Sequence, residues 1–394
     1  MDYPDKPGND TMGVFQSDHK TVKIQLLKPL PGTAEPHRLN APGKELFRQE
    51  TKGSCIMYHP ALKTPLCEML GIDYPILQAG MGFVARGPLA GAVSAAGGLG
   101  CIGAGTMTPK ELTAEIAIVR SMTDKPFAVD LLFATAGGKS AQMFSSDTQA
   151  LIEVVFNEKV PVLVSGLGNP GPIVAEAHAA GMKVLSLTGS TKNAMRLAAS
   201  GVDAVIAQGY DGGGHTGSVG TMTLLPSVID AVNVPVLAAG GLADGRGLAA
   251  SLALGAIGVW LGTRFIATLE AWGHDNYKNR IVEIGDEDTI RTKCFSGKPC
   301  RMIQNDTTRA WETPELQAQL KPFPHQTRNV TEWLGSDPYM AGRRDGQTDI
   351  GALAAGQSSA LIHEVKPAGE IVRDIMAEAS QVLERLTGRV PVRG

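Results

Sequence analysis

The 394-residue sequence has little excess charge of either sign and no long apolar run. Its formal net charge is −3 and its isoelectric point about 6.3, so it lacks the broad basic surface with which proteins bind nucleic acid or anionic membranes. No stretch of about 18 apolar residues predicts a membrane span, and no short apolar core predicts a signal peptide. We therefore expect a cytoplasmic protein that acts on a small molecule, with no nucleic-acid or membrane partner.

Cysteine is also scarce. The five cysteines include no Cys-x-x-Cys pair, and an odd number argues against a closed disulfide framework. We expect free thiols in a reducing compartment and predict no metal site. In that setting the Asn-x-Thr triplets at Asn9, Asn305 and Asn329 are interpreted as chance.

The first 56 residues differ from the rest of the chain. Residues 1–56 contain scattered proline, glycine, lysine and aspartate around one short alternating run at 22–27. Such a segment has too little apolar content to build a core. We predict an N-terminal arm at 1–56, followed by a folded unit at 57–394.

From Leu66 onward, short apolar runs alternate with amphipathic segments of helical length. The eight runs lie at residues 75–79, 99–102, 127–132, 161–164, 183–187, 204–207, 234–239 and 257–261. Continuous apolar strands separated by helices predict a parallel sheet that is buried on both faces. Eight such units predict an α/β fold of the TIM-barrel type, (β/α)₈. We expect an inserted segment at about 269–350 after the eighth strand, and a closing helix near the C-terminus.

An open, doubly wound sheet is the alternative fold, because two segments match the Gly-x-Gly-x-x-Gly pattern. The match at 98–103 follows a helical pattern and runs into a strand, which is the wrong order for a dinucleotide site. The match at 166–171 follows a strand, but no acidic residue stands about 20 positions further on to bind a ribose. Residues 138–140 resemble the end of a phosphate-binding loop, yet Phe133 occupies the position of its first glycine. We reject all three.

Glycines gather where the predicted strands end, which is the edge at which barrels carry their active sites. They are Gly80 and Gly82, the three glycines at 212–214, Gly240 and Gly241, and Gly262. The last two groups follow neighbouring strands and predict a phosphate cradle; the alternative is a tight turn with Asp244 capping the next helix. A compact cofactor such as FMN suits the cradle. His215, next to three glycines, is a candidate acid or base, although a glycine-rich hairpin with an incidental histidine is the simpler interpretation.

Taken in order, these residues resemble the FMN-dependent nitronate monooxygenases and their relatives, the NAD(P)H:quinone reductases and the flavin-type enoyl-acyl-carrier-protein reductases. The matching segments are Thr64–Cys67 through Tyr74–Met81, Ser94–Gly100, Gly213–His215, Pro235–Gly247 and Gly262–Phe265. The resemblance extends from about residue 66 to 268 and resumes at 295–299 and 355–362. Agreement in this order is more specific than any single motif.

The resemblance implies that His215 is catalytic and that a mostly glycine set contacts FMN. The implied cofactor residues are Gly80, Met81, Gly82, Asp130, Gln208, Gly213, Gly214, Gly240, Gly241, Gly262 and Thr263. Relatives often have asparagine at the position of Asp130, and a carboxylate there would disfavour an anionic reduced flavin. Leu187 also replaces a polar residue that some relatives place near the flavin.

Two activities remain open at this point. The first is FMN-dependent oxidation of nitronates or nitroalkanes by molecular oxygen, and the second is NAD(P)H-dependent reduction of a quinone or an enoyl thioester. A third interpretation, a flavin-binding barrel without activity, would leave His215 without a role. Lys139 is a candidate contact for an anionic substrate or an ordinary exposed lysine. The resemblance also implies that 277–334 covers the active site and is a candidate contact with a second subunit.

Overall fold

The structure, a computed structural model, describes residues 58–133 and 146–388. The chain divides into the units Met1–Cys55 and Ile56–Gly394, and the description below concerns the second. The predicted arm at 1–56, the segment 138–140 and the candidate anion contact Lys139 lie outside the described residues.

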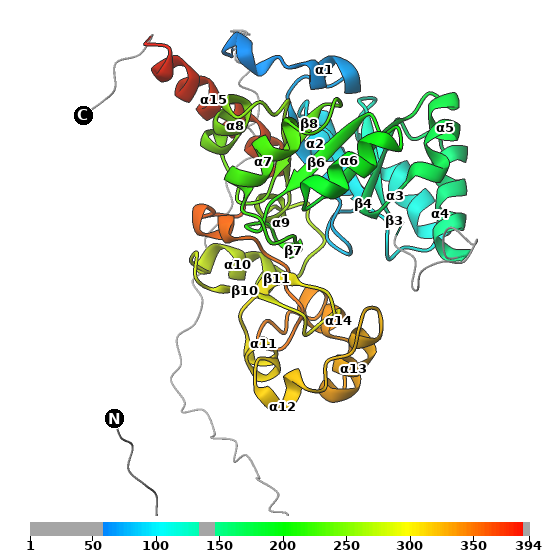
Figure 1. Ribbon diagram of the computed structural model, residues 1–394, viewed down its shortest axis with the longest axis vertical. Helices are drawn as coiled ribbons and strands as arrows, with labels where there is room; N and C mark the ends of the chain where they lie inside the picture. Colours follow the sequence, from blue (N-terminus) through cyan, green and yellow to red (C-terminus); the bar gives the residue numbers. More distant parts are fainter. Residues whose placement is uncertain (1–57, 134–145, 389–394) are drawn as a thin grey trace, which may run out of the picture. The chain divides into compact units, whose positions relative to one another are not determined.

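Eight parallel strands form the centre of the described chain (Figure 1). Their bounds are β1 Ile76–Gln78, β2 Gly100–Gly103, β3 Phe127–Phe133, β4 Val162–Gly168, β5 Lys183–Thr188, β6 Ala204–Gln208, β8 Val236–Ala239 and β9 Val259–Leu261. They are ordered β1-β9-β8-β6-β5-β4-β3-β2. The two ends of this order meet, because Gln78 N donates to Leu99 O at 3.0 Å and Leu77 bridges Leu99. This closure confirms the TIM barrel and excludes the open sheet.

Helices follow the strands and cover the outside of the barrel. They are α2 Gly87–Ala95, α3 Pro109–Met122, α4 Ser146–Asn157, α5 Gly171–Ala179, α6 Thr191–Ala199, α7 Thr221–Ile229, α8 Gly245–Ala253 and the short α9 Thr263–Ile266. Side-chain caps explain where two of these helices begin. Thr108 and Glu111 form a capping box at the start of α3, and Asp244 accepts a hydrogen bond from Gly247 N at the start of α8. Asp244 therefore caps a helix, as the turn interpretation required.

The C-terminal helix α15 (Ala368–Leu386) lies beside α8, and Gly245 N donates to Glu378 Oε2 at 2.8 Å (Figure 1). Its apolar face buries Ile371 and Met376, whereas Leu386 near its end is 74% exposed. The predicted closing helix is thus present, and its last turn is not part of the core. Before the barrel, η1 (Pro60–Leu62) precedes α1 (Pro65–Leu70), and Leu66 and Leu70 of α1 pack with the interior cluster.

Side chains alternate between two apolar layers along each strand. Alternate residues from the eight strands form one interior cluster that includes Ala128, Leu185 and Ile206. Their neighbours pack outward against the helices in a larger cluster. Two positions beyond these three residues stand Asp130, in the middle of β3, and Leu187 and Gln208, near the carboxyl ends of β5 and β6. The interior face therefore changes from apolar to mixed at the edge where the glycines lie.

The segment after β9, here called the excursion, has its own small core. It contains α10 Asp275–Glu283, β10 Thr289–Thr292, β11 Cys300–Ile303, α11 Asp306–Trp311, α12 Pro314–Gln317, α13 His325–Leu334 and α14 Pro338–Arg343, with η2 Gln357–Leu361 after it. The apolar cluster of this core consists of Cys294, Phe295, Cys300, Met302, Trp311, Val330 and Ala352. Strands β10 and β11 form an antiparallel sheet with the two-residue strand β7 (Gly214–His215). The excursion therefore connects directly to the histidine segment.

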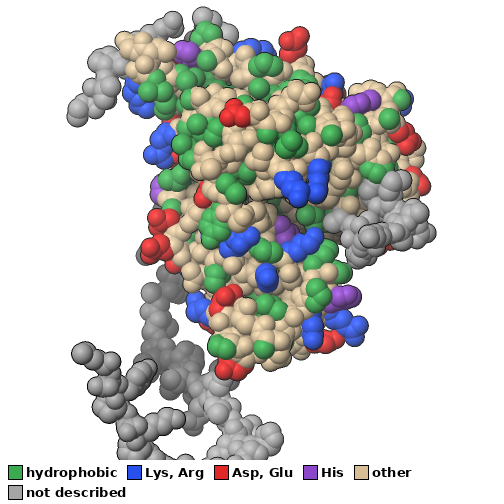
Figure 2. All heavy atoms as spheres, viewed as in Figure 1, with side chains coloured by type: hydrophobic (Ala, Val, Ile, Leu, Met, Phe, Trp, Pro, Cys, Tyr) green, Lys and Arg blue, Asp and Glu red, His purple; other side chains and the backbone are tan. Residues whose placement is uncertain are grey.

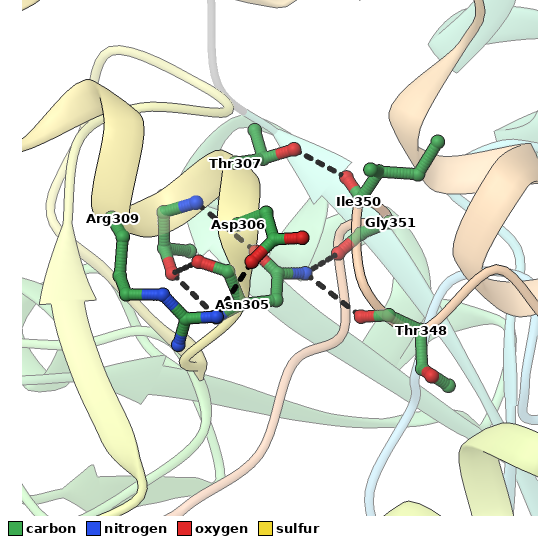
Figure 3. Close-up of polar contacts among 8 residues, drawn as sticks. Asn305, Asp306, Thr307, Arg309, Thr348, Ile350 and Gly351 are labelled. Carbon is green, nitrogen blue, oxygen red and sulfur yellow. Dashed lines mark hydrogen bonds and ion pairs between the residues drawn. The ribbon is translucent and has the colours of Figure 1, made fainter. Parts of the chain in front are cut away.

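Polar contacts tie the start of α11 to the returning chain (Figure 3). Asn305 Nδ2 donates to the carbonyl oxygens of Thr348 at 3.0 Å and Gly351 at 2.8 Å, and Thr307 Oγ1 donates to Ile350 O at 2.9 Å. Asn305 is 4% exposed and also caps α11. The side-chain amide of Asn305 therefore joins the start of α11 to the segment 348–351.

The four cysteines within residues 58–133 and 146–388 are buried and unpaired, as expected for free thiols. They are Cys67, Cys101, Cys294 and Cys300. Across the same ranges, no helix has both the length and the apolar character needed to cross a bilayer.

Candidate active site

The carboxyl edge of the barrel presents a surface with few side chains, here called the glycine floor, formed by Gly80, Gly166, Gly240, Gly241 and Gly262. A Cβ placed on Gly80 would lie 2.3 Å from Cβ of Asp130, and one on Gly166 would lie 2.6 Å from Oδ1 of Asp130. One on Gly262 would meet only ordinary contacts at 3.7 Å, among them Sδ of Met81. Glycine at positions 80 and 166 therefore leaves room for the Asp130 side chain. The shortage of side chains along this edge also suits the close approach of a flat molecule.

The end of β8 has the features of an anion cradle. Gly240 and Gly241 have φ values of +91° and +72°, and the hydrogen bonds of the described residues leave both amide N–H groups without a partner. Thr263 follows β9, and its Oγ1 accepts a hydrogen bond from Gly356 N at 2.9 Å. Free amides on consecutive left-handed glycines are suited to phosphate oxygens. The residues present therefore fit a flat cofactor that ends in a phosphate.

His215 lies on a strand rather than in a glycine loop, which corrects the sequence interpretation. Strand β7 pairs antiparallel with β11, placing His215 opposite Cys300. Its Nε2 lies 2.9 Å from Oγ of Ser296, and Gln208 Nε2 donates to the carbonyl oxygens of Gly213 and His215 at 3.2 Å each. Gln208, predicted to contact the cofactor, thus also positions the backbone of the histidine.

The surroundings of His215 are electropositive. Burial, followed by the charges of Lys298 and Arg343, lowers the pKa of His215 to about 4. Neither cation forms an ion pair with a carboxylate in the described part of the chain; Arg343 donates instead to the carbonyl oxygens of Gly82 at 2.9 Å and Ala352 at 3.1 Å. The imidazole is therefore neutral at pH 7. Figure 2 shows lysine and arginine side chains around a hollow in which a histidine lies.

The pKa of Asp130 is raised, whereas that of His215 is lowered. Burial raises the pKa of Asp130 to about 8, although a hydrogen bond from Gly166 N at 2.7 Å favours the charged form. The side chain is 6% exposed. The sequence interpretation treated it as a carboxylate; burial at this position favours the neutral acid instead.

The structure brings most of the predicted site residues to one edge of the barrel. They lie at or just after the ends of β1, β6, β8 and β9, within β3 and on β7. Sequence reasoning missed the roles of Ser296, Lys298 and Arg343. Ser296 and Lys298 could have been found, because the segment 295–299 resembles the same family in sequence. Nothing in the sequence pointed to Arg343. Gly166 was examined only as part of a rejected dinucleotide motif, and it is instead the hydrogen-bond donor to Asp130.

Comparison with known proteins identifies the family. Residues 63–378 match the nitronate monooxygenase family. The chain belongs to this family. It is 34% identical over 365 residues to the (3aS,4S,5R,7aS)-5-hydroxy-7a-methyl-1-oxo-octahydro-1H-indene-4-carboxyl-CoA dehydrogenase of Mycobacterium tuberculosis, covering 84% of this chain and 99% of that protein.

Two solved structures extend the comparison. FabK from Thermotoga maritima is 38% identical with a TM-score of 0.74, covering 83% of this chain and 99% of FabK. The nitroalkane oxidase from Streptomyces ansochromogenes is 30% identical with a TM-score of 0.72, covering 82% and 99%. The chain is therefore a flavin oxidoreductase of the nitronate monooxygenase family.

Proposed function

We propose that the protein uses FMN to oxidise nitronates, the anionic forms of nitroalkanes, with molecular oxygen. The observation that carries this proposal is the neutral His215, whose pKa is lowered by burial and by the charges of Lys298 and Arg343; in the described residues these two cations form no ion pair with a carboxylate. A site with uncompensated positive charge favours a substrate that arrives as an anion. An imidazole whose pKa is about 4 is a weak base at neutral pH, so removal of a proton from a neutral nitroalkane is the slower reaction.

The roles of the residues follow from their positions. Gly80, Met81 and Gly82 would lie against the flavin ring, and the amides of Gly240 and Gly241 would hold its phosphate together with Gly262 and Thr263. A bound flavin would supply electron transfer from substrate to oxygen.

The other side chains bind and orient the substrate. Lys298 and Arg343 attract the anion, His215 provides a neutral imidazole as its hydrogen-bonding partner, and Ser296 fixes Nε2 of that ring. Gln208 holds the strand on which the histidine stands. Together these groups favour a negatively charged substrate over its neutral conjugate acid.

Oxygen uptake tests the proposal. The purified protein is supplied with a pre-formed alkyl nitronate or with the neutral nitroalkane at the same concentration and pH, and heat-released pigment is identified by chromatography. We expect FMN and much faster oxygen uptake with the nitronate. Release of FAD, a colourless protein that cannot be reconstituted, or no nitronate-dependent uptake would contradict the proposal.

The second candidate function is NAD(P)H-dependent reduction of an enoyl thioester. One observation favours a thioester substrate: the chain is 34% identical to a carboxyl-CoA dehydrogenase over 99% of that protein's length. The same two cations would stabilise negative charge that develops on a thioester oxygen. In this case NADH or NADPH would reduce the flavin, and an enoyl thioester would reoxidise it. Steady NAD(P)H consumption that depends on an enoyl thioester would favour this function over nitronate oxidation.

A further inference from the structure

Asp130 occupies a specific position under the proposed flavin site. It is the fourth of the seven residues of β3, and its backbone lies opposite Gly103 of β2 and Val164 of β4. Its Oδ1 accepts the Gly166 N–H, and its Oδ2 lies 2.5 Å from the point where a Cβ on Gly80 would stand. The carboxyl group is thus packed between two glycines of the floor, whose lack of side chains makes room for it.

The charged form of this carboxyl group has little to stabilise it. The groups facing it from the neighbouring strands are backbone of β1 and β4 and the thiol of Cys101 on β2, whose own pKa is raised well above its usual value by burial and by Asp130. In the described residues no lysine, arginine or histidine forms an ion pair with Asp130. One amide donor does not offset the loss of water around a buried carboxylate.

We propose that Asp130 is a protonated carboxylic acid in the resting protein, and that release of its proton to solvent lowers the reduction potential of the flavin bound on the glycine floor. A neutral acid leaves the site without negative charge, whereas a carboxylate opposes the addition of electrons to a neighbouring ring. This inference rests on flavin binding at the proposed site, but it does not depend on which substrate is oxidised.

The direction of the pH effect follows from the raised pKa. In the unfolded chain the carboxyl group loses its proton near pH 4, whereas in the folded protein it does so near pH 8. Between these values the folded state binds the extra proton, so the contribution of Asp130 to stability falls as the pH rises from about 4 to about 8. Above pH 8 Asp130 is ionised in both the folded and the unfolded chain, and the buried charge lowers the free energy of unfolding by its full amount.

Potentiometry of the flavin-loaded protein tests the inference. The midpoint potential is measured from pH 6 to pH 10 against a reference dye for the wild type, Asp130→Asn and Cys101→Ser. Asparagine has the same shape and its amide oxygen can still accept the Gly166 N–H, so this variant is expected to fold and to bind flavin. We expect an additional fall of the wild-type potential beginning near pH 8, its absence in Asp130→Asn and its retention in Cys101→Ser. Parallel pH profiles for the wild type and Asp130→Asn would overturn the inference.

Infrared spectroscopy provides a second measurement that does not depend on electron transfer. The wild-type protein at pH 7 should show a carbonyl band of a protonated carboxylic acid that disappears as the pH is raised through about 8 and is missing in Asp130→Asn. Identical spectra for the two proteins at pH 7 would overturn the inference. A colourless protein would refute the proposed function, whereas the infrared band would still decide the protonation state of Asp130.

Discussion

The barrel and the excursion contribute to the same site by different means. At the barrel edge, Gly240 and Gly241 offer backbone amides and the absence of side chains. The excursion offers functional side chains instead: Ser296 beside His215, and the cations Lys298 and Arg343. The proposed function accordingly assigns cofactor binding to the barrel and selection of the substrate's charge to the excursion.

The excursion has an apolar cluster of its own among β11, α11 and α13, although α10 and Ile303 pack with the cluster around the barrel. Substitutions of polar residues in the excursion should therefore alter substrate selection and leave flavin content unchanged. Substitutions in the glycine floor should remove the cofactor and with it every activity. The following variants test this separation.

The largest effect is expected from Gly241→Leu. The new side chain would start 3.0 Å from Cβ of Asp211 and would obstruct the amide cradle, so we expect a protein with little or no flavin and activity reduced by more than about 10²-fold. Gly181→Leu is the matched control, because Gly181 has a similar φ of +78° but no atom within 4 Å of its Cβ position. Flavin content is read from absorbance. Normal flavin binding by Gly241→Leu would show that the cradle is elsewhere.

His215→Ala should keep flavin and lose turnover. We expect a loss of roughly 10²-fold on neutral nitroalkanes, the usual size for a lost proton-transfer group, and a smaller loss on pre-formed nitronates. Because burial and two cations hold the pKa of His215 at about 4, the wild-type rate on nitronates should show no histidine titration between pH 5.5 and 7.5. Equal losses on both substrates would show that His215 only donates or accepts a hydrogen bond and takes no proton from the neutral nitroalkane.

A smaller effect is expected from Lys298→Met, which removes one of the two cations near His215 while keeping an apolar chain against Phe323. The KM for a nitronate should rise about 10-fold, with kcat and flavin content little changed, because a charge that binds substrate and transition state alike mainly affects KM. Lys293→Met removes an exposed lysine of the same segment and serves as the control. A fall in flavin content in Lys298→Met alone would end the proposed division between barrel and excursion.

The smallest effect is expected from a chain that begins at Met57. The described contacts closest to this point are the edge-on packing of Tyr58 and Tyr74 and the hydrogen bond from His59 N to Ser380 Oγ at 2.8 Å, and both remain in the shortened chain. We expect a melting temperature within about 3 °C of the full chain and unchanged flavin content. An insoluble or flavin-free product would show that residues 1–56 belong to the core.

The barrel could be predicted from the sequence because its apolar runs and helical segments repeat eight times, and each repeat gives a local signal. The glycines of the cofactor site could be located because they follow those runs directly. Strand β7 could not be predicted, since two residues carry no periodic pattern. Ser296, the partner of His215, is 81 positions away in the chain. The neutral state of Asp130 depends on burial by other strands, which no local pattern reports.

The most direct test of the central claim is anaerobic rapid mixing of the flavin-loaded protein with a pre-formed nitronate and, separately, with NADH and NADPH. The proposal predicts a fast change of the flavin absorbance with the nitronate and no comparable change with either nicotinamide. Fast bleaching by NADH or NADPH, with no response to the nitronate, would contradict it and identify the protein as a flavin reductase.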